Sequence, residues 1–251
     1  PCLVWSSYLP GAGSQPLRYV DLMSGRKPHL LNRYINNLGK ETQLSYRSST
    51  RDFLADRDAG TPWVTRLPFP VQVVGEQAVE DRVTGMRIVT RYANHHGYWD
   101  EAEREFRGFG RVDRIDVEDF AALDAGGGEQ REQYQPPTLT RSWYHVGAWH
   151  QHDRFLRQFE QEYWQPRYRA AFPAAPPLPA EPVLPDGRLD AAPTIADPQA
   201  VSRLSPAERR EAARACKSLV LRQEVFALDA HAMGASEASL MLQATPFTVA
   251  E

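Results

Sequence analysis

The feature that most constrains the fold is a series of short runs in which side chains alternate with a period of two. The clearest run lies between Thr84 and Tyr92, where Ile88 and Tyr92 fall on one side and Arg87 and Arg91 on the other. Successive side chains of a β-strand point to opposite faces. We therefore expect a strand of an antiparallel sheet, with Met86, Ile88, Thr90 and Tyr92 on the buried face and Arg87, Val89 and Arg91 on the polar face.

Runs with the same strand character recur along most of the chain. They are rich in β-branched and aromatic residues and are bounded by Gly, Pro or Asn. The runs extend over Leu3–Trp5, Gln43–Tyr46, Val71–Val74, Thr138–Tyr144 and Leu221–Asp229. Gly97, Gly108 and Gly110 lie inside aromatic-rich segments, where a missing Cβ permits a bulge or a close backbone approach. The pattern predicts a mainly β fold with curved sheets.

One helix is expected to interrupt this pattern. Ser205 and Glu208 form a capping box, and Pro206 occupies the first helical position, where an N–H is not needed. Apolar side chains follow at helical spacing, at Ala212, Cys216, Leu219 and Val220. The sequence predicts an α-helix near residues 205–220, followed by a strand from about Leu221.

Two segments divide the chain into regions. Gly126–Gly128 offer no side chains to pack and predict a boundary or a long loop. The Pro-rich stretch 173–198 cannot continue a helix and predicts an extended surface insert. The chain begins at Pro1, with neither an initiator Met nor a signal-peptide pattern, so we expect it to be part of a longer protein.

Composition excludes several classes of protein. The 251 residues, 42% of them hydrophobic, suffice for one large or two ordinary domains. The formal net charge of -3 provides no basic surface for nucleic-acid phosphates, so nucleic acid is not an expected partner. The sequence has no apolar run of about 18 residues that would cross a membrane. Cys2 and Cys216 offer no disulfide framework and are expected to be small buried side chains.

Two histidine clusters are candidate metal sites. They consist of His95 and His96 with Asp100 and Glu103, and of His145, His150 and His152. Imidazole and carboxylate groups are common ligands of divalent metals. Neither cluster has a standard zinc spacing, and on a strand His145 would lie on the opposite face from His150 and His152. Ordinary histidines on a polar sheet surface or at an interface are the preferred interpretation.

Two acidic patterns bear on enzymatic function. Ser48–Thr50 and the acidic stretch Glu101–Glu105 have the residue types of mono-ADP-ribosyltransferases, but the serine motif is permuted and no motif marks an upstream Arg. Asp52, Asp56 and Asp58 lack the glycine and closing glutamate of a calcium-binding EF-hand and predict a polar loop. The sequence has no nucleophile elbow, phosphate loop or dinucleotide glycine pattern. We predict no enzyme, and no catalytic, cofactor-binding or metal-binding residues.

Aromatic residues are dense between residues 63 and 109. The side chains are Trp63, Phe69, Tyr92, Tyr98, Trp99, Phe106 and Phe109. Such rings can form a sugar-binding platform, but packing within stacked β strips is the preferred interpretation. Exposure of Trp63, Trp99, Trp143 and Trp149 in a groove would favour the platform, and their burial would favour packing.

A series of distinctive segments occurs in a fixed order along the chain. The first group is Asp21–Leu31, Asn36–Gly39, Pro62–Val71, Arg91–Asp100 and Glu103–Gly110. The second group is Ser142–Trp149, the predicted helix from Ser205, and Leu221–Asp229. In this order the segments resemble the middle regions of the B subunits of insecticidal toxin complexes and of plasmid-virulence B proteins. The resemblance covers nearly the whole chain, with Gly126–Gly128 and the insert 173–198 as variable parts.

The resemblance implies a fold and a set of partners. In that family the B subunit combines a β-propeller, which docks on the channel of the A subunit, with long β strips of the rearrangement-hotspot (Rhs) type. The strips form a hollow cocoon with the C subunit. Residues 1–26 would be the end of the propeller, 27–125 the N-type middle region and 138–251 the C-type middle region with the insert. The toxic enzyme and the self-cleaving protease would lie outside this chain.

The leading hypothesis is therefore structural. We expect a non-catalytic shell segment of a secreted toxin-complex B subunit, which encapsulates and helps to deliver a cytotoxic C-subunit effector without a cofactor. The expected partners are the C subunit and the A-type channel, with an extracellular location and no direct membrane insertion. A glycan- or surface-binding β module and a metal-dependent or ADP-ribosylating enzyme are the alternatives. Alone, the chain would expose strand edges and self-associate.

Overall fold

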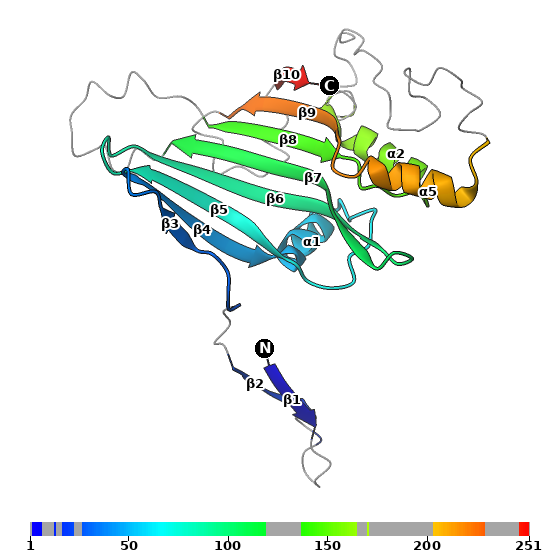
Figure 1. Cartoon of the computed structure of the whole chain (residues 1–251), viewed down its shortest axis with the longest axis horizontal. Helices are drawn as coiled ribbons and strands as arrows, with labels where there is room; N and C mark the ends of the chain where they lie inside the picture. The colour runs from blue at the N-terminus through cyan, green and yellow to red at the C-terminus, as the bar shows by residue number, and fades with distance from the viewer. Residues whose placement is uncertain are drawn as a thin grey trace.

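The computed structural model describes residues 2–6, 13, 17–22, 27–118, 137–164, 170, 203–228 and 246–250. Its main body is an antiparallel sheet of eight strands in the order β10-β9-β8-β7-β6-β5-β4-β3 (Figure 1). The sheet is open, with β3 and β10 at its two edges. The mainly β, antiparallel fold predicted from the alternating runs is confirmed.

Two long central strands give the sheet its extent. The strands are β3 (Arg33–Ile35), β4 (Lys40–Ser48), β5 (Gln72–Asp81), β6 (Arg87–Asp100), β7 (Glu105–Glu118), β8 (Thr138–Tyr144), β9 (Val220–Ala227) and β10 (Pro246–Ala250). β6 and β7 have 14 residues each. β8 has the bounds that the sequence predicts, and β9 begins one residue before the predicted start.

The sheet continues across the segment that contains Gly126–Gly128. β7 pairs with β8 from Asp116 opposite Thr138 to Arg111 opposite Trp143. Strands from both predicted middle regions therefore belong to one sheet. The three glycines and the insert 173–198 lie outside the described residues.

Burial along β6 differs from the predicted alternation. Val89, expected on the polar face, is only 6% exposed and lies opposite Ala78 of β5. Met86, expected on the buried face, is 48% exposed because it lies in the turn before β6 begins at Arg87. Thr90 is only 7% exposed and Arg91 is exposed, as predicted, so the period-two pattern located the strand correctly but did not predict that both of its faces are partly covered.

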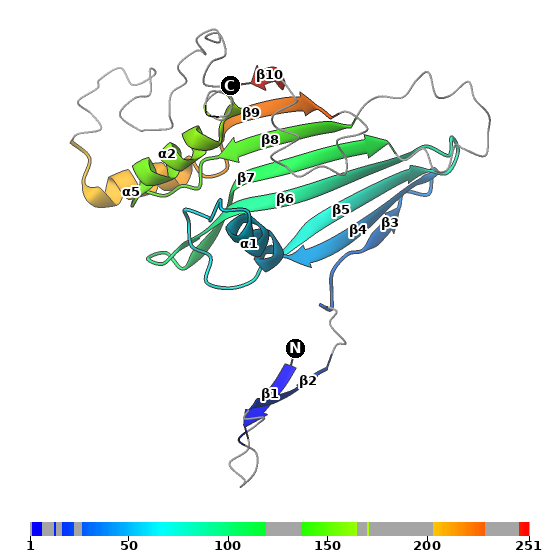
Figure 2. The same ribbon diagram turned by 180° about the vertical axis from the view of Figure 1, so that it is seen from behind.

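Three helices of the described chain lie towards one end of the sheet (Figures 1 and 2). α1 (Ser49–Asp58) follows β4, α2 (His152–Glu162) follows β8, and α5 (Pro206–Ala215) precedes β9. The capping box of α5 is confirmed. The helix ends earlier than predicted, because Ser218 adopts a φ of 70° and turns the chain towards β9. Cys216 is the C-cap, and Leu219 and Val220 are exposed rather than on a buried helix face.

Two helices were not predicted. The polar loop expected at Asp52–Asp58 is wrong, since Ser48 accepts a hydrogen bond from Thr50 N and starts α1 there. The strand geometry assumed for His145–His152 is also wrong, because β8 ends at Tyr144 and α2 begins at His152. Between them the chain passes through Gly147, whose φ of 69° suits glycine.

The core lies between α2 and the sheet. Phe155, Leu156 and Phe159 of α2 are at most 4% exposed and pack with Trp143 of β8. Burying an apolar side chain of this size stabilises the fold by about 1.5–3 kcal/mol. A second cluster joins Leu139, Trp164, Phe226 and Leu228 at the next part of the sheet. The core is therefore concentrated over the β8 side of the sheet.

A separate hairpin precedes the main sheet. It pairs β1 (Cys2–Ser6) with β2 (Leu17–Asp21), and Leu3, Val4 and Tyr19 are each at least 59% exposed. The expectation that Cys2 is buried is wrong, because every residue of β1 is exposed. Cys216 is half-buried. Among the described residues, no helix is long and apolar enough to span a bilayer.

Candidate functional site

A β-bulge between β6 and β7 positions the candidate site. Arg107 and Gly108 of β7 together oppose the single residue Tyr98 of β6. Gly108 has a φ of +90°, a conformation that favours glycine. Bulges bend a strand and re-aim its side chains. The prediction that Gly108 permits a bulge is confirmed, and Tyr98 is the residue of β6 that lies opposite the bulge.

The segment Trp63–Arg66, which we call the strap, is bound along β6 at this bulge. Four hydrogen bonds hold it: Trp63 Nε1 to Asp56 Oδ2 (2.5 Å), Val64 N to His96 Nδ1 (3.2 Å), Thr65 Oγ1 to Gly97 O (2.8 Å), and Trp99 N to Arg66 O (3.0 Å). A Cβ on Gly97 would lie 2.9 Å from the Trp63 ring, so glycine permits the close approach. The strap therefore has a fixed position beside Tyr98.

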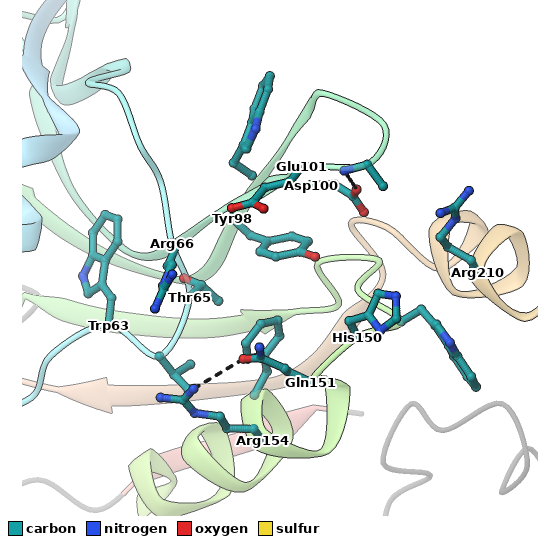
Figure 3. Close-up of a pocket in the computed structure, with 15 residues that line it drawn as sticks. Trp63, Thr65, Arg66, Tyr98, Asp100, Glu101, His150, Gln151, Arg154 and Arg210 are labelled. Carbon is teal, nitrogen blue, oxygen red and sulfur yellow. Dashed lines mark hydrogen bonds between the residues drawn. The ribbon is translucent and has the colours of Figure 1, made fainter. Parts of the chain in front are cut away.

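A cavity of 810 Å³ opens between the strap, the bulge and two helices (Figure 3). Its lining comes from the strap, from Tyr98–Ala102, from Trp149–Gln151 with the first turn of α2, and from Arg210 of α5. Tyr98 packs edge-on against Phe155, with ring centroids 5.5 Å apart. No described residue hydrogen-bonds the Tyr98 hydroxyl. Burial, with Asp100 nearby, raises the pKa of Tyr98, so the hydroxyl remains a donor at neutral pH.

Among the described residues, the cavity lining carries three guanidinium groups and two carboxylates. They belong to Arg66, Arg154, Arg210, Asp100 and Glu101. Asp100 is already engaged: it accepts from Ala102 N (3.0 Å) and Glu103 N (3.1 Å) and pairs with Arg107 (2.9 Å). Arg210 pairs with Glu103 at 2.9 Å, and Arg154 donates to the neutral Gln151 at 3.3 Å.

Beneath α2, the sheet carries a second feature, a layer of buried charged residues. The strand registers place Arg111 and Arg222 in one row, separated by Trp143, and Asp113, Arg141 and Glu224 in the next row. α2 contributes Glu162. The buried charge layer thus contains three guanidiniums and three carboxylates, each at most 5% exposed: Arg111, Arg141, Arg222, Asp113, Glu162 and Glu224.

Each charge in this layer has a close partner of opposite sign. Arg141 binds Asp113 through Nε (2.9 Å) and Nη2 (2.5 Å), and Arg222 Nε lies 2.8 Å from Glu224. Arg111 Nη1 donates to Glu162 at 2.7 Å and so joins the sheet to α2. Buried charges are tolerated when they are paired and hydrogen-bonded, and removal of one partner is strongly destabilising. The layer therefore fixes α2 on the sheet.

The partners set the protonation of the carboxylates. Burial raises the pKa of Asp113, but Arg111 and Arg141 outweigh it and hold the pKa well below the usual range. Burial likewise opposes ionisation of Glu162, and the hydrogen bond from His96 with the charge of Arg111 lowers its pKa overall. In Glu224 burial prevails and raises the pKa. Asp113 and Glu162 are carboxylates at neutral pH.

The first predicted histidine cluster does not converge on one point. His95 Nδ1 lies 2.6 Å from Asp56 of α1, whereas His96 Nε2 lies 2.8 Å from Glu162 of α2. Because His96 Nδ1 accepts the Val64 N–H, Nε2 carries the proton that Glu162 accepts. Within the described ranges, no three His, Cys, Asp or Glu side chains are placed to hold a metal ion.

The second histidine cluster is split between a loop and a helix. The rings of His145 and His152 lie 4.8 Å apart, and His145 Nδ1 accepts from Gly147 N at 2.9 Å. His150 is exposed and lines the cavity. His145 and His152 therefore pack together, while His150 belongs to the cavity lining.

The serine and acidic residues that resemble a mono-ADP-ribosyltransferase motif make contacts with different helices. Ser48 caps α1, and Ser49 Oγ accepts from Val71 N at 3.1 Å. Glu103 and Glu105 instead bind Arg210 and Lys217 on the α5 side, each at 2.9 Å. The transferase arrangement is not formed by these residues.

The tryptophans of the possible sugar-binding platform, Trp63, Trp99, Trp143 and Trp149, do not share one surface. Trp143 is fully buried and Trp63 is 9% exposed, whereas Trp99 and Trp149 are half-buried. Packing against other aromatic rings accounts for the positions of most of these rings. Trp63 lies edge-on between Phe53 (5.4 Å) and Phe109 (6.1 Å), and Trp99 packs edge-on against Phe69 at 4.9 Å.

Sequence reasoning missed the buried charge layer. Its signal is present as charged residues two apart on two strands, Arg111 with Asp113 and Arg222 with Glu224, and as Arg141 on the strand between them. The same spacing is typical of a solvated strand face. Only the register of the strands and the covering helix show that these charges face one another.

Comparisons with known proteins agree with this architecture. A family model described as the insecticide toxin TcdB middle/N-terminal region matches residues 18–147. No curated protein sequence gives a significant match. The crystal structures of TcdB2-TccC3 and TcdB2-TccC3-Cdc42 match 94% of this chain at 26% identity, with TM-scores of 0.60 and 0.61. The Photorhabdus luminescens Tc holotoxin pore matches 88% at 26% identity, with a TM-score of 0.56. This chain covers 10%, 10% and 9% of the respective matched chains.

Proposed function

Because the chain belongs to the family of the insecticide toxin TcdB middle/N-terminal region, we propose that it forms a wall segment of a protein shell in a secreted toxin complex. The observation that carries the proposal is the open eight-stranded antiparallel sheet, which matches about a tenth of much larger toxin-complex chains. A shell needs an extended wall built from strands that pair with further strands. An open sheet with accessible edges suits that role.

The β3 edge has the properties of a surface that a neighbour covers. Tyr34 and Ile35 of β3 are 46% and 44% exposed, and the flanking Leu31 and Leu38 are 59% and 84% exposed. Contiguous exposed apolar side chains at a strand edge favour pairing with another strand. In the proposed wall, the next strip of the same shell covers this edge.

The buried polar groups support a structural role without chemistry. The carboxylates of the buried charge layer are held by guanidiniums, and His95 and His96 each bond to a helix carboxylate. These pairings fix α1 and α2 on the sheet. The proposal assigns no reaction and no cofactor to this chain.

The proposed partners follow from the matched structures. TcdB2 is solved together with TccC3, and a further match is a Tc holotoxin pore. We infer that the full subunit of this chain encloses an effector with a C-type subunit and docks on an A-type channel outside the bacterial cell. The β1–β2 hairpin, with its exposed apolar residues, would continue into the propeller that makes the channel contact.

The experiment is co-expression of the full-length subunit with its C-type partner, followed by size-exclusion chromatography and protease digestion of the enclosed effector. The variant Ile35→Asp places a charge at the β3 edge. Val83→Asp, at an 80% exposed site in the β5–β6 turn, is the matched control. We expect Ile35→Asp to weaken co-elution and effector protection and Val83→Asp to leave both unchanged. Full protection with Ile35→Asp would contradict burial of this edge in a wall.

A further inference from the structure

We propose that the 810 Å³ cavity is a binding site for an acidic segment of extended polypeptide. The inference rests on the proposed function, because a shell that encloses an effector brings another polypeptide against its wall. It adds to that function a specific contact point, formed by the strap, the bulge and the start of α2 (Figure 3).

The cavity has cationic groups that the protein itself leaves without an opposite charge. Arg66 is exposed, its backbone oxygen is fixed by Trp99 N at 3.0 Å, and no described carboxylate pairs with its guanidinium. Arg154 is exposed and donates only to the neutral Gln151 among the described residues. Guanidinium groups bind carboxylates through two parallel hydrogen bonds. A ligand carboxylate would therefore find charge-assisted donors on two separate walls.

The acidic residues of the lining do not cancel this charge. Asp100 already accepts two backbone hydrogen bonds and pairs with the fully buried Arg107. Glu101 is exposed and is the remaining carboxylate of the lining. The first turn of α2 reaches the same wall, and its N-cap Gln151 makes no side-chain cap bond. The positive end of the helix adds to the attraction for an anion.

The remaining walls favour a ligand with an apolar body. The rings of Tyr98 and Phe155 pack edge-on at 5.5 Å, and the half-buried Trp149 lies beside Arg209, which is 5.9 Å from its ring. The Tyr98 hydroxyl is a donor with no partner among the described residues, placed to bind a peptide carbonyl. A single carboxylate would fill only part of 810 Å³, so the adjoining peptide backbone and apolar side chains would occupy the rest.

The test measures binding of a fluorescein-labelled octapeptide of alternating Asp and Leu to the full-length subunit by fluorescence anisotropy. The matched probe has Asn in place of Asp. We expect the Asp peptide to bind, with an affinity that falls as salt is raised. Arg66→Gln and Arg154→Gln should each weaken binding about tenfold, the typical effect of losing one charge-assisted hydrogen bond. Tyr98→Phe should cause a smaller loss.

Arg57→Gln is the control variant. Arg57 is exposed and, among the described residues, forms an ion pair only with the neighbouring Asp58 at 3.1 Å on α1, outside the cavity lining. We expect it to bind the Asp peptide like the unaltered subunit. Because Arg66, Arg154 and Arg57 are all exposed, thermal unfolding should be the same in the three variants.

The inference would be overturned by equal binding of the Asn peptide, by unchanged binding in the Arg66→Gln, Arg154→Gln double variant, or by full displacement of the peptide by an equal concentration of glutarate. The last would indicate a small-acid site. Complex formation with the C-type partner is measured in parallel. A subunit that assembles but does not bind the peptide would refute the cavity inference alone. One that binds the peptide but does not assemble would refute the shell proposal alone.

Discussion

The two halves of the eight-stranded sheet differ in how completely they are covered. On the β6–β9 side, α2 lies over one face, and Arg141, Trp143 and Glu224 have no exposed surface. On the β3–β5 side, every residue of β3 is exposed, and the buried residues are the polar Glu41 and Thr42 of β4 and Ala78 of β5. Both halves have the same antiparallel backbone pairing. Strand pairing alone therefore does not make a core, and a covering element does.

Charged residues show the same contrast. In the covered half, guanidiniums and carboxylates are both buried and pair with one another. In the open half, the buried carboxylate of Glu41 is held by Arg33 and Arg82, whose side chains are 50% and 53% exposed. Hydrogen bonds from Arg33 and Gln43 lower the pKa of Glu41 to about 2. In the open half, the buried carboxylate is thus paired with arginines whose side chains are about half exposed to solvent.

Acid should have the largest effect, and mainly on the covered half. The pKa values of Asp113 and Glu162 are lowered in the folded state, so the unfolded state binds more protons at low pH. The stability that these carboxylates contribute is present above about pH 4.5 and is lost as the pH falls. The pKa of Glu41 on β4 is lowered too, but its partners are exposed arginines, whereas Glu162 joins a helix to the sheet. Hydrogen exchange between about pH 7 and pH 3 should therefore show α2 losing protection before β4 and β5. Simultaneous loss of protection in both halves would contradict the contrast.

Removal of one carboxylate from the buried charge layer should have the next largest effect. Glu162→Leu leaves Arg111 buried without its 2.7 Å partner on α2. We expect the free energy of unfolding to fall by about 3–5 kcal/mol in urea titrations followed by tryptophan fluorescence. Glu160→Gln, on an exposed position of the same helix, is the control. A loss below about 1 kcal/mol would mean that the pair does not hold α2 on the sheet.

A smaller effect is expected where α2 approaches the sheet backbone. In Gly110→Ala, the new Cβ would lie 2.5 Å from Phe159 Cζ. Overpacking of this kind costs about 1–3 kcal/mol. The double variant Gly110→Ala, Phe159→Leu should lose less free energy of unfolding than the two single variants lose in total. A double-mutant cycle measures this difference. If the two losses simply add, the destabilisation by Gly110→Ala does not arise from the contact with Phe159.

The smallest effect is expected for an ion pair of the open half. Arg91 pairs with Glu76 across β6 and β5 at 3.2 Å, with side chains 58% and 39% exposed. Arg91→Gln should change the free energy of unfolding by about 1 kcal/mol or less, the usual contribution of a surface pair. A loss comparable to that of Glu162→Leu in the same urea titration would show that the two halves do not differ.

Local signals in the sequence predicted much of the fold. The bounds of β8 and the capping box of Ser205 and Glu208 depend on neighbouring residues, and both are confirmed. α2 could also have been predicted, because Phe155 and Phe159 are four residues apart, with Leu156 beside Phe155. α1 has a weaker signal, since Phe53 and Leu54 are its only large apolar residues and both are more than a third exposed.

The candidate site was less accessible to sequence reasoning. Gly108 predicted a bulge, but not that Tyr98 would project from it beside Arg66. The cavity brings together residues as distant in sequence as Arg66 and Arg210, and the buried charge layer pairs Arg111 with Glu162. Such contacts depend on strand register and helix docking. A single sequence contains no local pattern that specifies them.

The balance of the buried charge layer limits how this part of the protein can evolve. Three guanidiniums face three carboxylates, so replacement of one member leaves an unbalanced charge in the interior. Viable replacements must therefore occur together, with Arg111 changing alongside Glu162 and Arg141 alongside Asp113. Among relatives, these positions should change as correlated pairs, either exchanging signs or becoming apolar together. Correlated substitutions at residues far apart in the chain would thus indicate the contact between α2 and the sheet.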